Sequence, residues 1–160
     1  MDKTTEALAR FASSLRFENL GAGAVKAAKR HILDTVACAL GGYRSEPADI
    51  ARRLARANSG SPGARLIGDG ISTSLQMAAF ANAVMVRYLD ANDTFISRGS
   101  GHPSDVFAAV LAAAEASNAP GKQLIAGIVA AYEIFGALAD QVGIRDRGWD
   151  QGIFVAPAVA

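Results

Sequence analysis

The sequence has little cysteine, little proline and few aromatic residues, and each scarcity excludes a class of structure. Cys38 is the single cysteine among 160 residues, so the chain can form neither an internal disulfide nor a metal cluster of three or four cysteines. Hydrophobic residues reach 51%, many of them alanine, while prolines number five. This composition predicts a compact helical domain rather than a disordered chain, and the length predicts one domain.

An excess of charge of one sign is also lacking. Sixteen basic residues face fifteen acidic ones, so we expect no nucleic acid and no anionic membrane surface as a partner. No apolar run reaches the ~18 uncharged residues of a membrane span, and the first residues lack the apolar core of a secretory signal. Together with the low cysteine content, these features lead us to expect a cytoplasmic protein.

Apolar residues recur with a helical period in nearly every segment. This predicts an all-α fold, a multi-helix bundle-like domain that covers residues 1–160. The sequence Thr73-Ser74-Leu75-Gln76 reads as a capping box with Thr73 at the N-cap. Arg52 is expected on the solvent-exposed face of its helix. The expected helices cover residues 4–15, 23–40, 46–57, 73–90, 103–117 and 122–142, and a short extended piece is expected at 64–68.

The stretch 81–104 places two ionisable residues at the two ends of one polar loop. A helical pattern runs into Asp90, the loop spans 91–101, and a new pattern begins after His102, with Pro103 at the first helical position. Asp90 would lie at the negative end of one helix dipole and His102 at the positive end of another, an arrangement that favours acid–base chemistry. Free N–H groups after His102 would also suit a carboxylate. The alternative is a solvated aspartate and an ordinary helix cap.

Several motifs in this order resemble the MmgE/PrpD family. They are Leu89-Asp90-Ala91-Asn92-Asp93-Thr94, Gly101-His102-Pro103-Ser104, Ile32-Leu33-Asp34-Thr35 with Gly41-Gly42, and Pro120-Gly121-Lys122 leading to Ala131-Tyr132-Glu133. The resemblance implies the N-terminal part of a longer helical domain, truncated at residue 160, and a homodimer. It also implies a lyase without metal or other cofactor that acts on a small polycarboxylate. Dehydration of a 2-methylcitrate-like acid is the first choice, with decarboxylation or epimerisation as alternatives.

The resemblance also implies roles for particular residues. Asp90 and His102 match catalytic positions, and Thr94 and Ser104 offer hydroxyls to the substrate. Asp150 stands where family members carry a histidine after a glycine and an aromatic residue, so it is a candidate substrate contact. The alternative for Asp150 is an N-cap of the following helix. We expect Asp90, Thr94 and His102 to line one pocket with Asp150 at its rim.

A second hypothesis comes from another class of protein. The chain would then be a helical assembly or interaction domain with an incomplete site, because the family's remaining site residues would lie beyond Ala160. On this hypothesis the 160 residues alone are catalytically inactive.

Overall fold

The computed structural model describes residues 2–58, 60–61 and 63–160. Within these residues the chain is 68% helical and forms seven α-helices. The all-α prediction is therefore right for most of the chain but omits a small antiparallel pair of strands. The α-helices are α1 (Lys3–Ser14), α2 (Ala22–Gly42), α3 (Glu46–Arg56), α4 (Leu75–Arg87), α5 (Phe107–Ala116), α6 (Gly121–Gln141) and α7 (Val155–Val159). The strands are β1 (Gly63–Arg65) and β2 (Ser72–Ser74), and the 3-10 helices are η1 (Phe17–Asn19), η2 (Pro103–Val106), η3 (Arg145–Arg147) and η4 (Gln151–Phe154).

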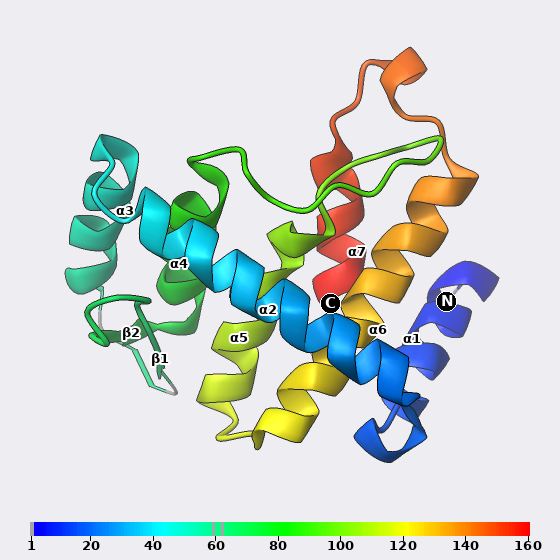
Figure 1. Cartoon of the computed structure of the whole chain (residues 1–160), viewed down its shortest axis with the longest axis horizontal. Coiled ribbons are helices and arrows are strands. Elements are labelled where there is room, and N and C mark those ends of the chain that lie inside the picture. Colours follow the sequence, from blue (N-terminus) through cyan, green and yellow to red (C-terminus); the bar gives the residue numbers. More distant parts are fainter. Residues whose placement is uncertain (1, 59, 62) are drawn as a thin grey trace.

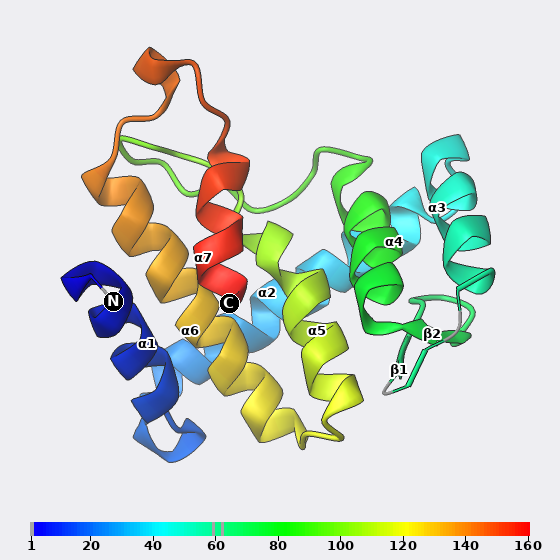
Figure 2. The same cartoon turned by 180° about the vertical axis from the view of Figure 1, so that it is seen from behind.

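The helices form two layers. The long helix α2 runs diagonally across one face (Figure 1), and α5, α6 and α7 lie on the opposite side, as the reverse view shows (Figure 2). Helix α4 packs against α2, α3 and α5, while α6 packs against α1, α2, α5 and α7. The connection from α4 to η2 and the segment around η3 lie at the same end of the molecule.

Two adjoining apolar clusters hold these layers together. Phe135 and Phe154 lie in one cluster and meet edge to face, with ring centroids 5.6 Å apart. Met85 and Phe107 lie in the other cluster, between α2, α4, α5 and α6. Tyr132 packs against both clusters from α6. Burial of such side chains stabilises the fold by roughly 1.5–3 kcal/mol each.

Helix α6 is long and apolar enough to cross a membrane by length and composition. We expected no such run from the sequence. In the structure α6 has helices on several sides, and Ile128, Ala131, Phe135 and Ala139 are buried within the fold. A buried core helix meets the same criterion of length and composition, and 33% of the apolar window of α6 is buried in this fold.

Two local predictions from the sequence are wrong. Ser74, not Thr73, is the N-cap of α4, where its hydroxyl accepts from the Met77 N–H. Thr73 lies in β2 instead, and its buried hydroxyl bonds to backbone carbonyls of Ala55 and Asn58. The hydroxyl therefore hydrogen-bonds to the chain at the end of α3 rather than capping α4.

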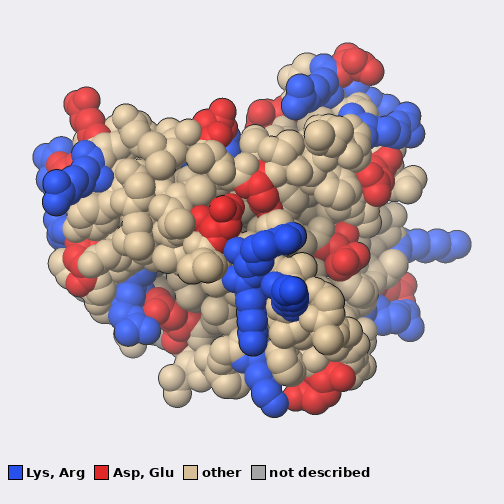
Figure 3. All heavy atoms as spheres, in the orientation of Figure 1, with Lys and Arg blue, Asp and Glu red and all other residues tan. Residues whose placement is uncertain are grey.

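Arg52 is the second error, because it points inward and is only 5% exposed. Its guanidinium donates to the carbonyl of Tyr43 and lies over the Tyr43 ring, 3.9 Å from the centroid. A cation can be buried when it has a hydrogen-bond acceptor and an aromatic face, and a periodic charge pattern does not reveal either. Elsewhere the face in Figure 3 mixes both signs of charge, with one short basic run crossing its middle.

Candidate functional site

Backbone hydrogen bonds shape the tip of the connection between α4 and η2. Phe95 and Gly101 exchange two backbone hydrogen bonds of 2.8 and 3.0 Å, which close a narrow loop. The Gly99 N–H donates to the carbonyl of Ala139 at 2.7 Å, which ties the loop tip to α6. A Cβ on Gly99 would lie 2.7 Å from the Phe154 ring and 2.9 Å from that carbonyl, so only glycine fits this approach.

Asp90 lies three residues beyond the end of α4 and faces solvent. It adopts the left-handed backbone conformation with φ of 51°, which aspartate tolerates better than most residues. Its side chain is 75% exposed and pairs with Arg87 at 3.0 Å. The sequence correctly predicts the end of the helix near Asp90, but the carboxylate is outside the last turn and has a cationic partner.

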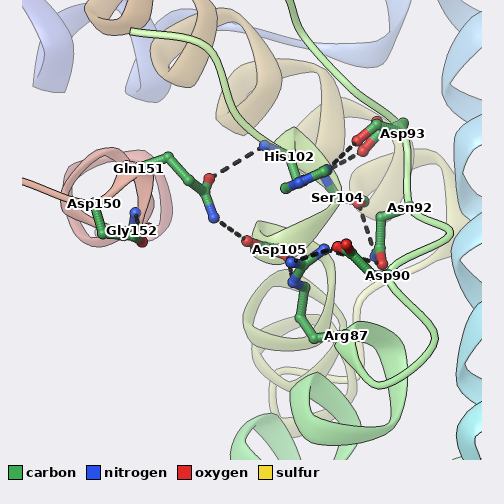
Figure 4. Close-up of polar contacts among 10 residues, drawn as sticks. All are labelled: Arg87, Asp90, Asn92, Asp93, His102, Ser104, Asp105, Asp150, Gln151 and Gly152. Carbon is green, nitrogen blue, oxygen red and sulfur yellow. Dashed lines mark hydrogen bonds and ion pairs between the residues drawn. The ribbon is translucent and has the colours of Figure 1, made fainter. Parts of the chain in front are cut away.

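The three predicted substrate contacts do not converge. Thr94 is exposed in the loop. Ser104 is 1% exposed, and its hydroxyl accepts from the Asn92 amide at 3.1 Å. Asp150 is the N-cap of η4, where it accepts from the Gly152 N–H at 2.8 Å, so the capping alternative describes its observed contact. In Figure 4 Asp150 stands with Gly152 on a separate turn, away from His102. Their roles in binding a substrate remain predictions.

His102 is the N-cap of η2, as expected, and its ring is held by the loop. Nδ1 lies 2.8 Å from the carbonyl oxygen of Asp93. A carbonyl oxygen can only accept, so Nδ1 must carry a proton. In the neutral ring Nε2 is then unprotonated and can accept a proton, as a general base must.

Asp93 lies at the centre of the polar contacts around His102. The sequence-based prediction named Asp90, not Asp93, as the catalytic carboxylate. Its carboxylate is only 12% exposed. Oδ1 accepts from the Ser104 N–H at 3.0 Å, so a carboxylate of the chain already occupies the helix N–H that was expected to bind substrate. Oδ2 lies 3.3 Å from Nδ1 of His31, on α2. Figure 4 shows Asp93 beside His102 at the start of η2.

A second chain of contacts reaches His102 from the other side. The Gln151 carbonyl accepts from the His102 backbone N–H at 3.2 Å, and its amide donates to Asp105 at 2.8 Å. Asp105 in turn lies 3.4 Å from Arg87, which also contacts Asp90 and Asn92. Asp90 and His102 are therefore linked only indirectly, through Arg87, Asp105 and Gln151 (Figure 4).

Burial shifts two ionisable groups of this region. Burial raises the pKa of Asp105, and hydrogen bonding by Gln151 and the charge of Arg87 offset part of that rise. Burial also raises the pKa of Tyr132, and the negative charge of Asp93 raises it further. The Tyr132 hydroxyl therefore stays protonated and faces the cluster as a neutral group.

The predicted pocket is not one of the five hollows found among the described residues. None of these hollows is lined by Asp90, Thr94, His102 or Asp150. The most voluminous, about 670 Å³, lies between α1, α5, α6 and α7 and is lined mainly by apolar side chains. In the part of the chain that the structure describes, no three histidine, cysteine or acidic side chains converge as metal ligands do.

Three residues of the polar network around His102 were not predicted as site residues from the sequence: Asp93, His31 and Gln151. The sequence carried a signal for one of them, because Asp93 belongs to the same acidic motif as Asp90. His31 is half-buried, with Asp93 and Tyr132 as neighbours. No pattern in the sequence indicated that α2 would bring it to the loop.

Comparison with known proteins identifies the family. A model of the MmgE/PrpD N-terminal domain matches residues 6–160. The chain is 35% identical over 106 residues to 2-methylcitrate dehydratase of Salmonella typhi, covering 60% of this chain and 22% of that protein. It is 31% identical over 156 residues to 2-methylcitrate dehydratase of Cupriavidus necator, covering 89% and 32%. The chain thus spans about a third or less of the length of these curated relatives. It belongs to the MmgE/PrpD family, whose N-terminal domain it matches over nearly its whole length.

Proposed function

We propose that this chain supplies the His102 part of a lyase site that dehydrates a 2-methylcitrate-like polycarboxylate. The observation that carries the proposal is the His102 ring itself, with Nδ1 bound to the Asp93 carbonyl and Nε2 left as the proton acceptor. The names of the relatives supply the substrate class, because those proteins are 2-methylcitrate dehydratases.

The reaction breaks one C–H bond and one C–O bond. A base removes a proton from a carbon that bears a carboxylate, hydroxide leaves the neighbouring carbon with a proton from an acid, and a double bond forms with release of water. The base needs a free lone pair near neutral pH, and a neutral imidazole provides one. His102 Nε2 fits the role of base. Asp90 remains the alternative base, and its exposure makes it the weaker candidate.

The substrate's carboxylates need donors, and Thr94 remains a candidate because its hydroxyl is exposed in the loop. Ser104 could contribute only after its contact with Asn92 is given up. Epimerisation also begins with removal of a proton beside a carboxylate, whereas decarboxylation releases carbon dioxide and delivers a proton to the carbanion that is left. Both reactions use a proton-transfer residue and remain alternatives to dehydration. A cytoplasmic homodimer is part of the proposal: the compartment rests on the composition of the sequence, and the dimer rests on the resemblance.

One observation favours a second candidate, a helical assembly domain without a complete site. Asp90, Thr94 and Asp150 are exposed and do not meet His102 in this chain. On this candidate the 160 residues serve to pack against other parts of a larger assembly, and they turn over no substrate.

Turnover of 2-methylcitrate separates the two candidates. The unsaturated product should be measured with this chain alone and with a full-length protein that contains it, and citrate and iminodisuccinate should be tried as competing substrates. The lyase proposal expects formation of the double bond from 2-methylcitrate by the full-length protein. Absence of turnover with all three acids would contradict the proposal and favour the assembly domain.

A further inference from the structure

The Asp93 side chain is held between two elements that are distant in sequence. Its Oδ1 accepts from the Ser104 N–H on η2 at 3.0 Å, and its Oδ2 faces Nδ1 of His31 on α2 at 3.3 Å. The backbone of the same residue supplies the carbonyl that binds His102 Nδ1 at 2.8 Å. One residue therefore connects α2, η2 and the His102 ring.

His31 is itself held in place on its other side. Its ring lies 5.3 Å from the Tyr132 ring, tilted by 48°, so the imidazole sits between Asp93 and α6. Because the Tyr132 pKa is raised, its hydroxyl carries no charge that would repel the carboxylate. Asp93 is thus restrained by one hydrogen bond from η2 and by close contact with the His31 ring of α2, although its buried Oδ2 makes no hydrogen bond to the described residues. These contacts limit how far its carbonyl can turn.

The free imidazole ring of histidine favours the opposite tautomer, with the proton on Nε2. A ring that must serve as a base through Nε2 therefore needs an acceptor fixed at Nδ1. Here that acceptor is a backbone carbonyl in a loop. It can fix the orientation of the ring only if the loop itself is held in place. The restraint on the Asp93 side chain provides this hold.

We propose that Asp93, restrained by His31 and the Ser104 N–H, is the positioning residue that keeps His102 in the Nδ1–H tautomer with Nε2 free. The catalytic meaning of this inference rests on the proposed function, whereas the tautomer can be measured without any substrate. Asp93 acts through His102 and does not itself need to touch a substrate.

Imidazole nitrogen chemical shifts test the inference directly. The chain has two histidines, so the signals can be assigned by comparison with His102→Gln, which retains only those of His31. In the wild-type chain His102 should show a protonated Nδ1 and an unprotonated Nε2. Asp93→Ala removes the acceptor of the Ser104 N–H and the partner of His31, so the Nε2–H tautomer should appear. Asp93→Asn keeps an oxygen for the Ser104 N–H and should largely restore the wild-type pattern.

Asp34→Asn is the matched control, because it removes an exposed carboxylate three residues from His31 on the same helix. It should leave the His102 signals unchanged. A wild-type His102 with the proton on Nε2 would overturn the inference, and so would a folded Asp93→Ala with an unchanged Nδ1–H tautomer. If Asp93→Ala does not fold, His31→Ala decides the matter, since loss of one restraint should still populate the second tautomer detectably.

Kinetics of the full-length protein separate this inference from the proposed function. If 2-methylcitrate is turned over, Asp93→Ala should lower kcat by roughly tenfold or more with a smaller change in KM. If 2-methylcitrate is not turned over by the wild type, the proposed function fails, and the tautomer measurement still decides whether Asp93 positions His102.

Discussion

One long connection precedes helix α4 in the chain and another follows it, and different side chains hold the two in place. The segment 57–74 joins α3 to α4 through the strand pair. The buried neutral side chains of Thr73 and Asn82 bond to the backbone in its described part, and the ion pairs Arg56–Asp69 and Arg65–Glu115 add further contacts. Residues 88–102 join α4 to η2, and ionisable side chains fix them, chiefly Asp93 and His102. Neutral hydroxyl and amide groups hold the same bonds at any pH, whereas carboxylates and imidazoles can exchange protons. Both connections contain carboxylates paired with arginine, but the second also contains the imidazole of His102, which makes it the candidate for acid–base chemistry.

The largest expected effect on stability lies in the first connection. Asn82 is 1% exposed, accepts from the Ile67 N–H at 3.0 Å and donates to the Arg65 carbonyl at 3.0 Å. Asn82→Ala leaves both backbone groups without partners and should lower the free energy of unfolding by roughly 2–4 kcal/mol. Denaturant titration measures this loss.

The control for this prediction is Asn19→Ala, at an exposed asparagine, which should change stability by less than about 0.5 kcal/mol. The imidazole signals of His102 should be the same in both variants. A changed His102 tautomer in Asn82→Ala would show that the two connections are not independent, and the comparison would fail.

A smaller effect is expected from Gln151→Ala in the second connection. The substitution removes the acceptor of the His102 N–H and the donor to Asp105, and it should cost about 1 kcal/mol. The His102 amide should also exchange its hydrogen with solvent faster, which hydrogen exchange followed by NMR detects. Asp150→Ala, which removes only a cap, is the neighbouring control. It should cost roughly 0.5–1 kcal/mol and leave that amide unchanged.

The smallest effect depends on pH and concerns Asp105. Because its folded pKa is raised above the unfolded value of 3.8, ionised Asp105 disfavours folding, and this cost disappears as pH falls through the raised pKa. Asp105→Asn keeps an acceptor for Gln151 and does not titrate. The wild type should therefore gain stability relative to Asp105→Asn as pH is lowered from 7 towards 3.8. Thermal unfolding of both proteins across this range measures the difference. A relative loss over that range would contradict burial as the dominant cause of the shift.

Much of the fold could be predicted from the sequence, because its helices follow from local periodicity. The expected ends of α2, α3 and α6 lie within two residues of those observed. Arg52 and Thr73 were misplaced because their partners, Tyr43 and the end of α3, are set by tertiary packing. Local patterns carry no information about such contacts.

The candidate site was predictable only in part. The motif and the helix start located His102 and the loop correctly. The motif contains both Asp90 and Asp93, and it does not indicate that the Asp93 carboxylate turns inward while that of Asp90 stays exposed. The catalytic role of Asp90 stays a prediction. The contact between His31 and Asp93 depends on how α2 packs across the loop. That packing is a tertiary feature, which local sequence patterns do not show.

We propose that proton transfer runs through His102. Turnover by the His102→Gln variant tests this proposal most directly. Glutamine keeps a side-chain donor of similar reach towards the Asp93 carbonyl but has no titratable nitrogen. In the full-length protein with 2-methylcitrate as substrate, we predict that kcat falls by about 10²-fold or more while circular dichroism and the unfolding midpoint change little. Near-normal turnover in a folded His102→Gln protein would contradict the claim and remove His102 from the mechanism.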